Sequence, residues 1–258
     1  HVKKSARIMI EEKINNFLNA PIDSINFGNV GDINLNQNIK IFWGEDEIGQ
    51  LLKGSSISSP IAEAINSEYL SSEKKLLVSA KLQNWIDQLI KTKLWPLKEE
   101  VNEKTTPNVR ALQFNIFENL GTLSIDDFTS FLKNISSEDK SVLSKLGIRI
   151  GAKYFFVPNF LKKTSMELTA ILWCVFDQIK FDGLIPLPKD GRVSFITDNE
   201  MKKSYWTSIG YLKLNNFALR IDVFERIFFI ARQKIKVGPF FDSADLMNPL
   251  GCNKDQLK

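Results

Sequence analysis

The spacing of apolar residues along the chain is helical over most of its length. Between residues 72 and 100, apolar side chains recur at steps of three and four positions, which predicts one long helix that Pro96 would kink or divide. Shorter stripes and start signals predict further helices at 5–18, 107–120, 124–135, 136–146, 164–179, 197–210 and 223–236. The chain is therefore expected to be mainly helical.

Other segments show the patterns of strands and turns. Residues 39–51 predict a strand, a turn that contains Gly44, and a second strand. Residues 147–158 predict a β-hairpin around Gly151 and Ala152. Short strands are also expected at 192–195, 212–214 and 218–221.

Together these elements predict an α+β fold, mainly helical, with short β-hairpins. The changes of pattern divide the chain into three expected segments. Residues 1–70 form a small α+β segment with a β-hairpin, residues 71–146 a helical segment, and residues 147–258 a basic α+β segment truncated at its C-terminal end.

The composition is that of a globular protein, and the sequence shows neither a membrane span nor a secretory signal. The chain has 258 residues, of which 43% are hydrophobic and 25% charged, as in ordinary globular proteins. Its most apolar run, residues 170–176, is far shorter than the roughly 18 residues of a membrane span. The first residues lack the apolar core of a secretory signal, so we expect a cytoplasmic protein without a membrane partner. Because the chain starts at His1 and not at Met, we also expect that residues upstream are missing.

Familiar catalytic and metal chemistry has no support in the sequence. His1 is the only histidine, and Cys174 and Cys252 are the only cysteines, so neither a Cys/His zinc site nor a Ser-His-Asp triad can be assembled. The apolar neighbours of Cys174 favour a core position. The glycine-rich phosphate loops of nucleotide-binding proteins are absent. We therefore expect no catalytic residue, no metal ligand and no cofactor in this chain.

Acidic residues gather at three places that deserve weighing as catalytic or Mg²⁺-binding groups. Residues 43–47 combine a β-like run with acids, but a solvated hairpin turn is the favoured interpretation. The pairs Glu99–Glu100 and Asp126–Asp127 lie near predicted helix ends, where solvation or capping accounts for them.

Charge is distributed unevenly along the chain. Residues 145–236 contain 16 Lys and Arg against 8 Asp and Glu, whereas the rest of the chain has 18 against 22. A basic region of this kind is typical of a surface that faces a polyanion. Uneven surface charge without a ligand explains the same numbers, and both interpretations remain open.

Basic residues in the positive region occupy positions suited to phosphate. Lys162 and Lys163 lie just before the helix expected to be capped by Thr164, where backbone N–H groups attract anions. The neighbouring aromatics Phe155, Phe156 and Trp206 are interpreted as core residues. Arg149 and Arg226 are instead interpreted as structural residues that pair with nearby acids. The candidate nucleic-acid-binding residues are Lys153, Lys162, Lys163, Arg192 and Arg220.

Several stretches, in order, resemble one family of helicases. The central ones are residues 146–152, 156–158, 161–162 and 168–173, and further similar stretches lie at 1–7, 31–43, 110–114, 118–121, 191–194, 210–211, 219–226 and 250–252. They resemble the large alphaproteobacterial superfamily 2 ATP-dependent helicases related to the mitochondrial RNA-degradosome helicase. The resemblance covers most of the chain, although no single stretch is as diagnostic as a phosphate loop.

The resemblance implies a role for the parent protein beyond this chain. In that family these stretches follow the motor, so ATP and Mg²⁺ are expected only in a motor upstream of His1 in the same polypeptide. The expected function is a non-catalytic C-terminal accessory region of a bacterial ATP-dependent RNA helicase that contacts RNA or another nucleic acid. The alternative is a structural, protein-interaction module that docks on the motor or recruits a partner protein. Whether the chain has any enzyme activity of its own stays uncertain.

Overall fold

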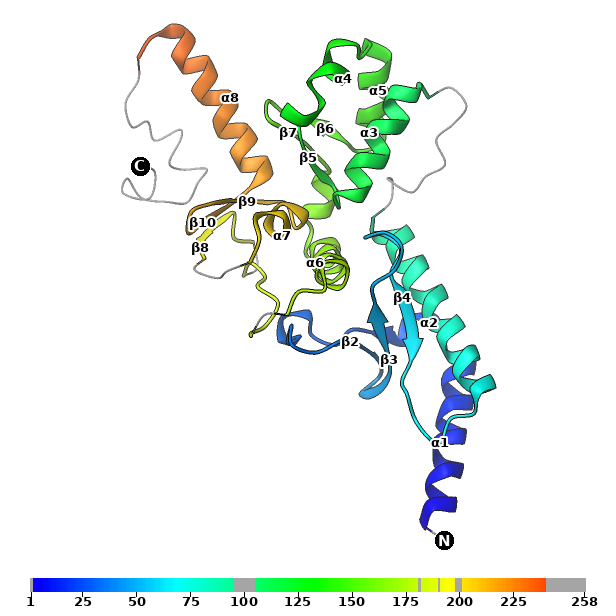
Figure 1. Cartoon of the computed structure of the whole chain (residues 1–258). Coiled ribbons are helices and arrows are strands. Elements are labelled where there is room, and N and C mark those ends of the chain that lie inside the picture. The colour runs from blue at the N-terminus through cyan, green and yellow to red at the C-terminus, as the bar shows by residue number, and fades with distance from the viewer. Residues whose placement is uncertain (1, 95–104, 181, 190, 198–200, 240–258) are drawn as a thin grey trace. The chain divides into compact units, whose positions relative to one another are not determined.

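The chain divides into two compact units in a computed structural model, which describes residues 2–94, 105–180, 182–189, 191–197 and 201–239 (Figure 1). For residues 2–6 only the backbone is described. The first unit comprises residues 1–93 and 171–185, and the second comprises residues 94–170 and 186–258. Both units combine helices with small antiparallel sheets, so the predicted α+β, mainly helical class is confirmed.

The first unit contains a four-stranded antiparallel sheet. Its strands, in spatial order, are β1 (Ile25–Asn26), β2 (Ile39–Trp43), β3 (Asp46–Leu52) and β4 (Ile61–Ala64). The predicted strand, turn and strand are confirmed as β2 and β3, and Gly44 has a positive φ of 61° in the turn between them. β1 and β4 were not predicted, because both are short and neither shows a sustained alternation of apolar residues.

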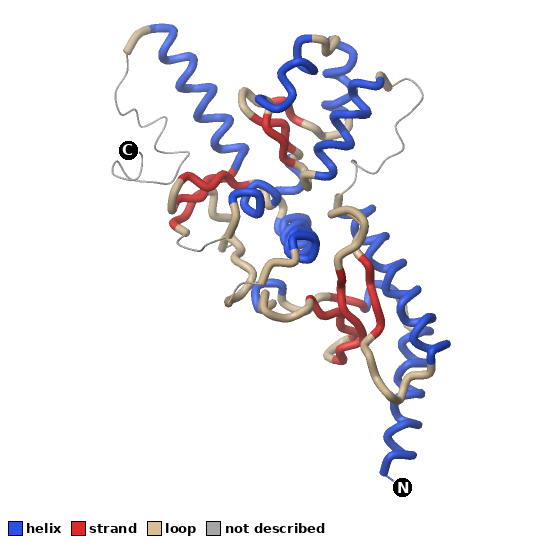
Figure 2. Tube along the Cα trace, in the orientation of Figure 1, coloured by secondary structure: helices blue, strands red, loops and turns tan. Residues whose placement is uncertain are grey.

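Two long helices accompany this sheet, and Figure 2 shows α2 beside its strands. They are α1 (Val2–Asn19) and α2 (Ser72–Lys93), and short 3₁₀ turns lie at Ile22–Ser24 and Val30–Asp32. The predicted stripe of α2 is buried at Leu82, Trp85, Ile86 and Ile90. The remainder of the predicted 72–100 helix, including Pro96, lies outside the described residues.

Side chains of α2 also bond to the strand at the sheet edge. The Gln83 Oε1 and Ser79 Oγ atoms accept the backbone N–H groups of Ala62 and Ala64 on β4, each at 2.9 Å. An edge strand otherwise leaves these donors without partners, which invites pairing with another chain. The helix therefore covers the edge of the sheet with specific hydrogen bonds.

Lys81 of α2 caps the C-terminal end of α1. Its Nζ donates to the carbonyls of Phe17, Leu18 and Ala20 at 2.7, 3.0 and 2.5 Å. The last carbonyls of a helix have no partner within it and carry partial negative charge, so a cation there is favourable. Burial lowers the pKa of Lys81.

The second unit begins with a helical region and a three-stranded sheet. In chain order its elements are α3 (Pro107–Glu118), β5 (Thr122–Ser124), a 3₁₀ turn (Asp126–Phe128), α4 (Thr129–Lys133), α5 (Ser137–Lys145), β6 (Arg149–Ile150), β7 (Tyr154–Phe156) and a second 3₁₀ turn (Pro158–Leu161). The strands pair in the order β5-β7-β6, so the predicted hairpin is confirmed and gains an unpredicted third strand.

Two predictions in this region need correction. The helix expected at 124–135 is wrong at its start, because Ser124 pairs with Tyr154 in the sheet and α4 begins only at Thr129. Phe114, which belongs to the predicted apolar stripe of the 107–120 helix, is 63% exposed on α3. The other stripe positions Val109, Leu112 and Ile116 are fully buried.

The predicted cap of α5 is confirmed in full. The Ser136 Oγ accepts the Asp139 N–H, and the Asp139 carboxylate accepts the Ser136 N–H. The Thr106 hydroxyl, which caps α3, also donates to Asp139 at 2.8 Å and so joins the starts of the two helices. This hydroxyl is the main cause of a lowered pKa at Asp139.

The remaining elements form a second small sheet with helices around it. They are α6 (Lys163–Asp177), β8 (Ser194–Ile196), α7 (Lys203–Ser208), β9 (Tyr211–Leu214), β10 (Phe217–Arg220) and α8 (Ile221–Val237), and the strands pair in the order β8-β10-β9. The strands predicted at 212–214 and 218–221 and the helix predicted at 223–236 are confirmed. The predicted 197–210 helix is shorter, because α7 begins only at Lys203. Residues 198–200 of that prediction lie outside the described residues.

α6 begins one residue earlier than predicted. Thr164 is not its cap, because the Lys162 carbonyl already accepts the N–H groups of Ser165 and Met166. Lys162 therefore lies at the cap position and Lys163 is the first helical residue. The boundary between the two units, at residues 170 and 171, falls within this helix.

The residues interpreted as core are buried. Phe155, Phe156 and Trp206 expose 0%, 8% and 1% of their surfaces, and Cys174 exposes 5%. Burial raises the pKa of the Cys174 thiol to about 12, so the thiol stays protonated. Cys252 lies outside the described residues. In the described part of the chain, no helix has both the length and the apolar character needed to cross a membrane.

Candidate nucleic-acid interface

Three of the five candidate cations flank one apolar cluster in the second unit. Phe156, Leu212 and Ile221 form its buried centre, and Tyr154, Leu161 and Phe224 pack against it. Lys153 precedes Tyr154 in the chain, Lys162 follows Leu161, and Arg220 precedes Ile221. The fold thus brings together three segments that are up to 67 positions apart in the sequence.

Hydrogen bonds to the backbone of residues 192 and 193 hold that segment beside Arg220. The Tyr211 hydroxyl donates to the Arg192 carbonyl at 2.5 Å, and the Arg220 N–H donates to the Val193 carbonyl at 2.8 Å. Tyr211 itself pairs with Arg220 across β9 and β10. Burial raises the pKa of Tyr211 to about 12, so its hydroxyl remains a donor that holds the segment before β8. Four of the five candidates therefore lie on segments joined by the same small core.

A buried carboxylate on α8 holds the hairpin that carries Lys153. The Glu225 carboxylate accepts the backbone N–H groups of Ala152, Lys153 and Tyr154 at 2.5, 2.9 and 2.7 Å, and only 8% of the residue is exposed. Bonds between N–H groups and a charged acceptor are stronger than neutral ones. The role of Glu225 was not predicted from the sequence, although a lone Glu four positions after Ile221, on the apolar face of a helix, is a detectable signal.

Two of the candidates are neutralised within the chain. Arg220 donates from Nε and from a terminal nitrogen to the two Asp222 oxygens at 2.7 and 2.9 Å, and this pairing raises the pKa of Arg220. Lys153 Nζ lies 3.5 Å from Asp126 Oδ2. Both side chains must share or exchange these partners before they can bind a phosphate.

The other candidates lie on the exposed surface. Lys162, Lys163 and Arg192 are all exposed. Among the residues that the structure describes, neither Lys162 nor Arg192 has a carboxylate partner. Lys162 and Lys163 also lie at the N-terminal end of α6, where backbone N–H groups and the helix dipole favour an anion. These are the electrostatic requirements of a phosphate contact.

Three of the acids considered for catalysis or metal binding pair with lysines. Asp46 and Glu47, beside the β2–β3 turn, pair with Lys13 at 2.7 Å and with Lys40 at 2.8 Å. Asp126 begins a 3₁₀ turn and faces Lys153. Across the described ranges, no three His, Cys, Asp or Glu side chains are arranged to hold a metal ion. Glu99 and Glu100 lie outside those ranges.

Comparison with known proteins adds no family to this description. No family model, no curated protein and no solved structure matches the chain.

Proposed function

We propose that this chain is a non-catalytic accessory region of an ATP-dependent RNA helicase, and that its second unit contacts nucleic acid. The observation that carries the contact is the exposed pair Lys162 and Arg192, which lack carboxylate partners among the described residues although their segments share one core. The helicase assignment of the parent protein rests on the ordered resemblance in the sequence alone.

The mode of contact follows from which groups are available. Lys162 and the first N–H groups of α6 suit one phosphate, and the guanidinium of Arg192 suits another through two parallel bonds. Phe155, Phe156 and Trp206 are buried and so offer no face on which a base could stack. The proposed contact at Lys162 and Arg192 therefore involves the phosphate backbone and not stacking on these three aromatics.

A salt series on RNA binding tests this proposal. Fluorescence anisotropy of a labelled single-stranded RNA would be measured with the full 258-residue chain at increasing salt concentration. Each phosphate contact contributes about 0.7 to the slope of log affinity against log salt for a single strand. The double variant Lys162→Glu/Arg192→Glu should lower the slope by about 1.4 and weaken binding at every salt concentration.

A matched control separates local contacts from net charge. Lys91→Glu reverses one exposed cation on α2 in the first unit and should leave the slope unchanged. If Lys91→Glu and the single variant Lys162→Glu lowered the slope equally, net charge alone would explain the loss. RNA affinity that is independent of salt, or absent, would contradict the proposal.

One observation favours a second function, a protein-docking module. α8 begins at the sheet and extends beyond it (Figure 1), and its Phe229 and Ile235 side chains are 60% and 65% exposed. Exposed apolar side chains of this size are common at protein interfaces. This second function is tested by co-expressing the chain with the polypeptide encoded immediately upstream and measuring whether the two bind. Binding that is retained after Phe229→Ser/Ile235→Ser would exclude this face of α8 as the docking surface.

A further inference from the structure

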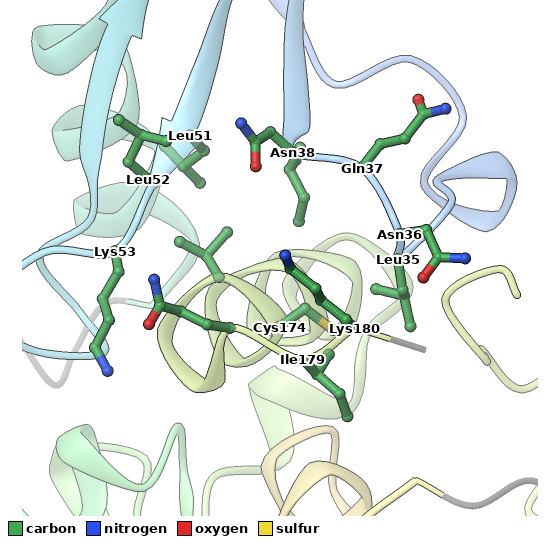
Figure 3. A pocket seen from close by; sticks show the side chains of 13 residues that line it. Leu35, Asn36, Gln37, Asn38, Leu51, Leu52, Lys53, Cys174, Ile179 and Lys180 are labelled. Carbon is green, nitrogen blue, oxygen red and sulfur yellow. The ribbon is translucent and has the colours of Figure 1, made fainter. Parts of the chain in front are cut away.

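A pocket in the first unit lies outside the surface discussed above. Its volume is about 140 Å³, and Figure 3 shows the side chains that line it. The walls come from the turn at residues 35–38, from the end of β3 at residues 51–53, and from the last turn of α6 with the residues that follow it. All of these residues belong to the first unit.

Hydrogen bonds join the turn at residues 35–38 to the segment that follows α6. The Leu35 N–H donates to the Gly183 carbonyl at 2.9 Å, and the Ile185 N–H donates to the Ile33 carbonyl at 3.0 Å. The Asn36 side-chain amide donates to Asp182 at 2.9 Å. A pocket with fixed walls loses little conformational freedom when a ligand enters, which favours binding.

The lining combines an apolar floor with a polar rim. The floor includes the buried side chains of Leu35, Leu51 and Cys174. Amide groups stand on the rim, including those of Gln37 and Gln178, each of which supplies both a donor and an acceptor. Gln178 has a positive φ of 49° directly after α6, a conformation uncommon outside glycine and asparagine.

The charge of the lining is positive. Lys53 and Lys180 are its charged residues, and the lining contains no Asp or Glu. In Figure 3 the Lys180 side chain extends across the pocket, and Lys53 stands at the opposite edge. Lys53 Nζ lies 4.6 Å from the centre of the Phe176 ring, and neither lysine has a carboxylate partner in the described part of the chain. Two cations at one pocket favour an anionic ligand.

Size and chemistry together narrow the ligand. The pocket of about 140 Å³ is smaller than the roughly 300 Å³ or more of a site that encloses a drug-sized molecule. It therefore holds one small ring or a similar group, and the rest of a larger ligand must lie outside its rim. A bare inorganic ion would gain nothing from the apolar floor, and an uncharged apolar ligand would gain nothing from two lysines. Amide side chains that donate and accept suit the edge of a nucleobase.

We propose that this pocket binds one nucleotide, with the base against the apolar floor, its edge toward the rim amides, and its phosphate toward Lys180 and Lys53. The same chemistry is present in a free nucleoside monophosphate and in the terminal nucleotide of a strand. The Cys174 thiol in the floor is buried and its pKa is raised to about 12, so the thiol stays protonated. The inference is independent of the surface on the second unit, since none of its residues is shared.

The test titrates the full chain with adenosine, guanosine, cytidine and uridine 5′-monophosphates by isothermal calorimetry. Saturable binding of at least one of them is expected, with weaker binding of the matching nucleoside and of inorganic phosphate. Lys180→Ala and Lys53→Ala should each weaken binding about tenfold, the loss expected for one contact to a charged group. Lys91→Ala, an exposed lysine outside the pocket, should bind as the unchanged chain does.

Further arms separate the two sources of the nucleotide and keep the two proposals distinct. Binding of a short 5′-phosphorylated oligonucleotide that depends on Lys180, without mononucleotide binding, identifies a strand end as the ligand. Lys162→Glu/Arg192→Glu should leave mononucleotide binding unchanged, so either proposal can fail alone. The inference is overturned if neither probe binds saturably, or if Lys53→Ala and Lys180→Ala, with unchanged thermal midpoints, bind as tightly as the unchanged chain.

Discussion

The two units use their basic residues differently. In the first unit, Lys81 is enclosed by three carbonyls at the end of α1, and Lys13 and Lys40 pair with Asp46 and Glu47. In the second unit, Lys162 and Arg192 are exposed and lack a carboxylate partner among the described residues. The same residue types thus support the fold at these positions of the first unit and remain available to a ligand at these positions of the second, as Lys53 and Lys180 do at the pocket of the first unit. Net charge cannot make this distinction.

The same contrast recurs at a finer scale within the second unit. Arg220 is held by Asp222 and Lys153 faces Asp126. Lys162, in contrast, lies at the start of a helix that has no acid in its first turn, and it forms no salt bridge among the described residues. Among the candidates found from sequence, Lys153 and Arg220 are therefore partly neutralised, whereas Lys162 and Arg192 have no carboxylate partner among the described residues. Substitutions at the two kinds of position should have different consequences.

The largest expected effect concerns the carboxylate that holds the hairpin under Lys153. Glu225→Ala leaves three partly buried N–H groups of residues 152–154 without their acceptor, at about 1 kcal/mol or more each. We expect the second unit to lose about 3 kcal/mol or more, measured by chemical denaturation with a probe in that unit. Glu138→Ala, at an exposed position of α5, serves as the control and should cost less than about 1 kcal/mol.

The next effect probes a cation that supports the fold. Lys81→Met keeps most of the side-chain volume but removes the donor to the last carbonyls of α1, and should destabilise the first unit by about 2 kcal/mol. Thermal unfolding of this variant would be compared with Lys91→Met on the same helix. Equal midpoints for the two variants would show that Lys81 has no capping role.

A smaller effect separates the available cations from the neutralised ones. Lys162→Ala should weaken binding of single-stranded RNA about tenfold, equivalent to about 1.4 kcal/mol. Lys153→Ala should weaken it less, because Lys153 already faces Asp126 at 3.5 Å. Anisotropy titrations at one fixed salt concentration measure both, and a larger loss for Lys153→Ala would reverse the ranking.

The smallest effect concerns pH and the cap of α5. The pKa of Asp139 is lowered in the folded chain, chiefly by the Thr106 hydroxyl, so the carboxylate stabilises the fold when ionised. This contribution is fully present above the ordinary value of about 3.9 and is lost as pH falls through the lower, folded pKa. Asp139→Asn should cost about 1 kcal/mol at pH 7, and the cost should shrink toward zero in acid. A cost that is constant from pH 7 into acid would contradict this role.

Local signals account for the parts of the fold that sequence predicted. The cap at Ser136 and Asp139, the β2–β3 turn at Gly44 and the hairpin around Gly151 depend on residues close in the chain. β5 was missed because its three residues become a strand only by pairing with β7, which lies about 30 positions later. Phe114 belongs to the apolar stripe of the predicted 107–120 helix but is exposed, because periodicity alone does not show which helix face is covered.

The candidate site was predictable only in part, for similar reasons. The sequence identified the cations, but the partners that neutralise some of them are set by the fold, as the pair Lys153–Asp126 shows. The Glu225 contacts and the pocket between residues 35–38 and 174–180 join segments more than 70 positions apart. No local pattern reports such distances.

Photo-crosslinking of the full chain to a single-stranded RNA, followed by identification of the crosslinked peptides, shows where the chain contacts nucleic acid. Crosslinks should concentrate in residues 153–163 and around Arg192, and should diminish in the Lys162→Glu/Arg192→Glu variant and as salt is raised. Crosslinks spread evenly over both units, or absent from these segments while RNA still binds, would contradict the proposed contact.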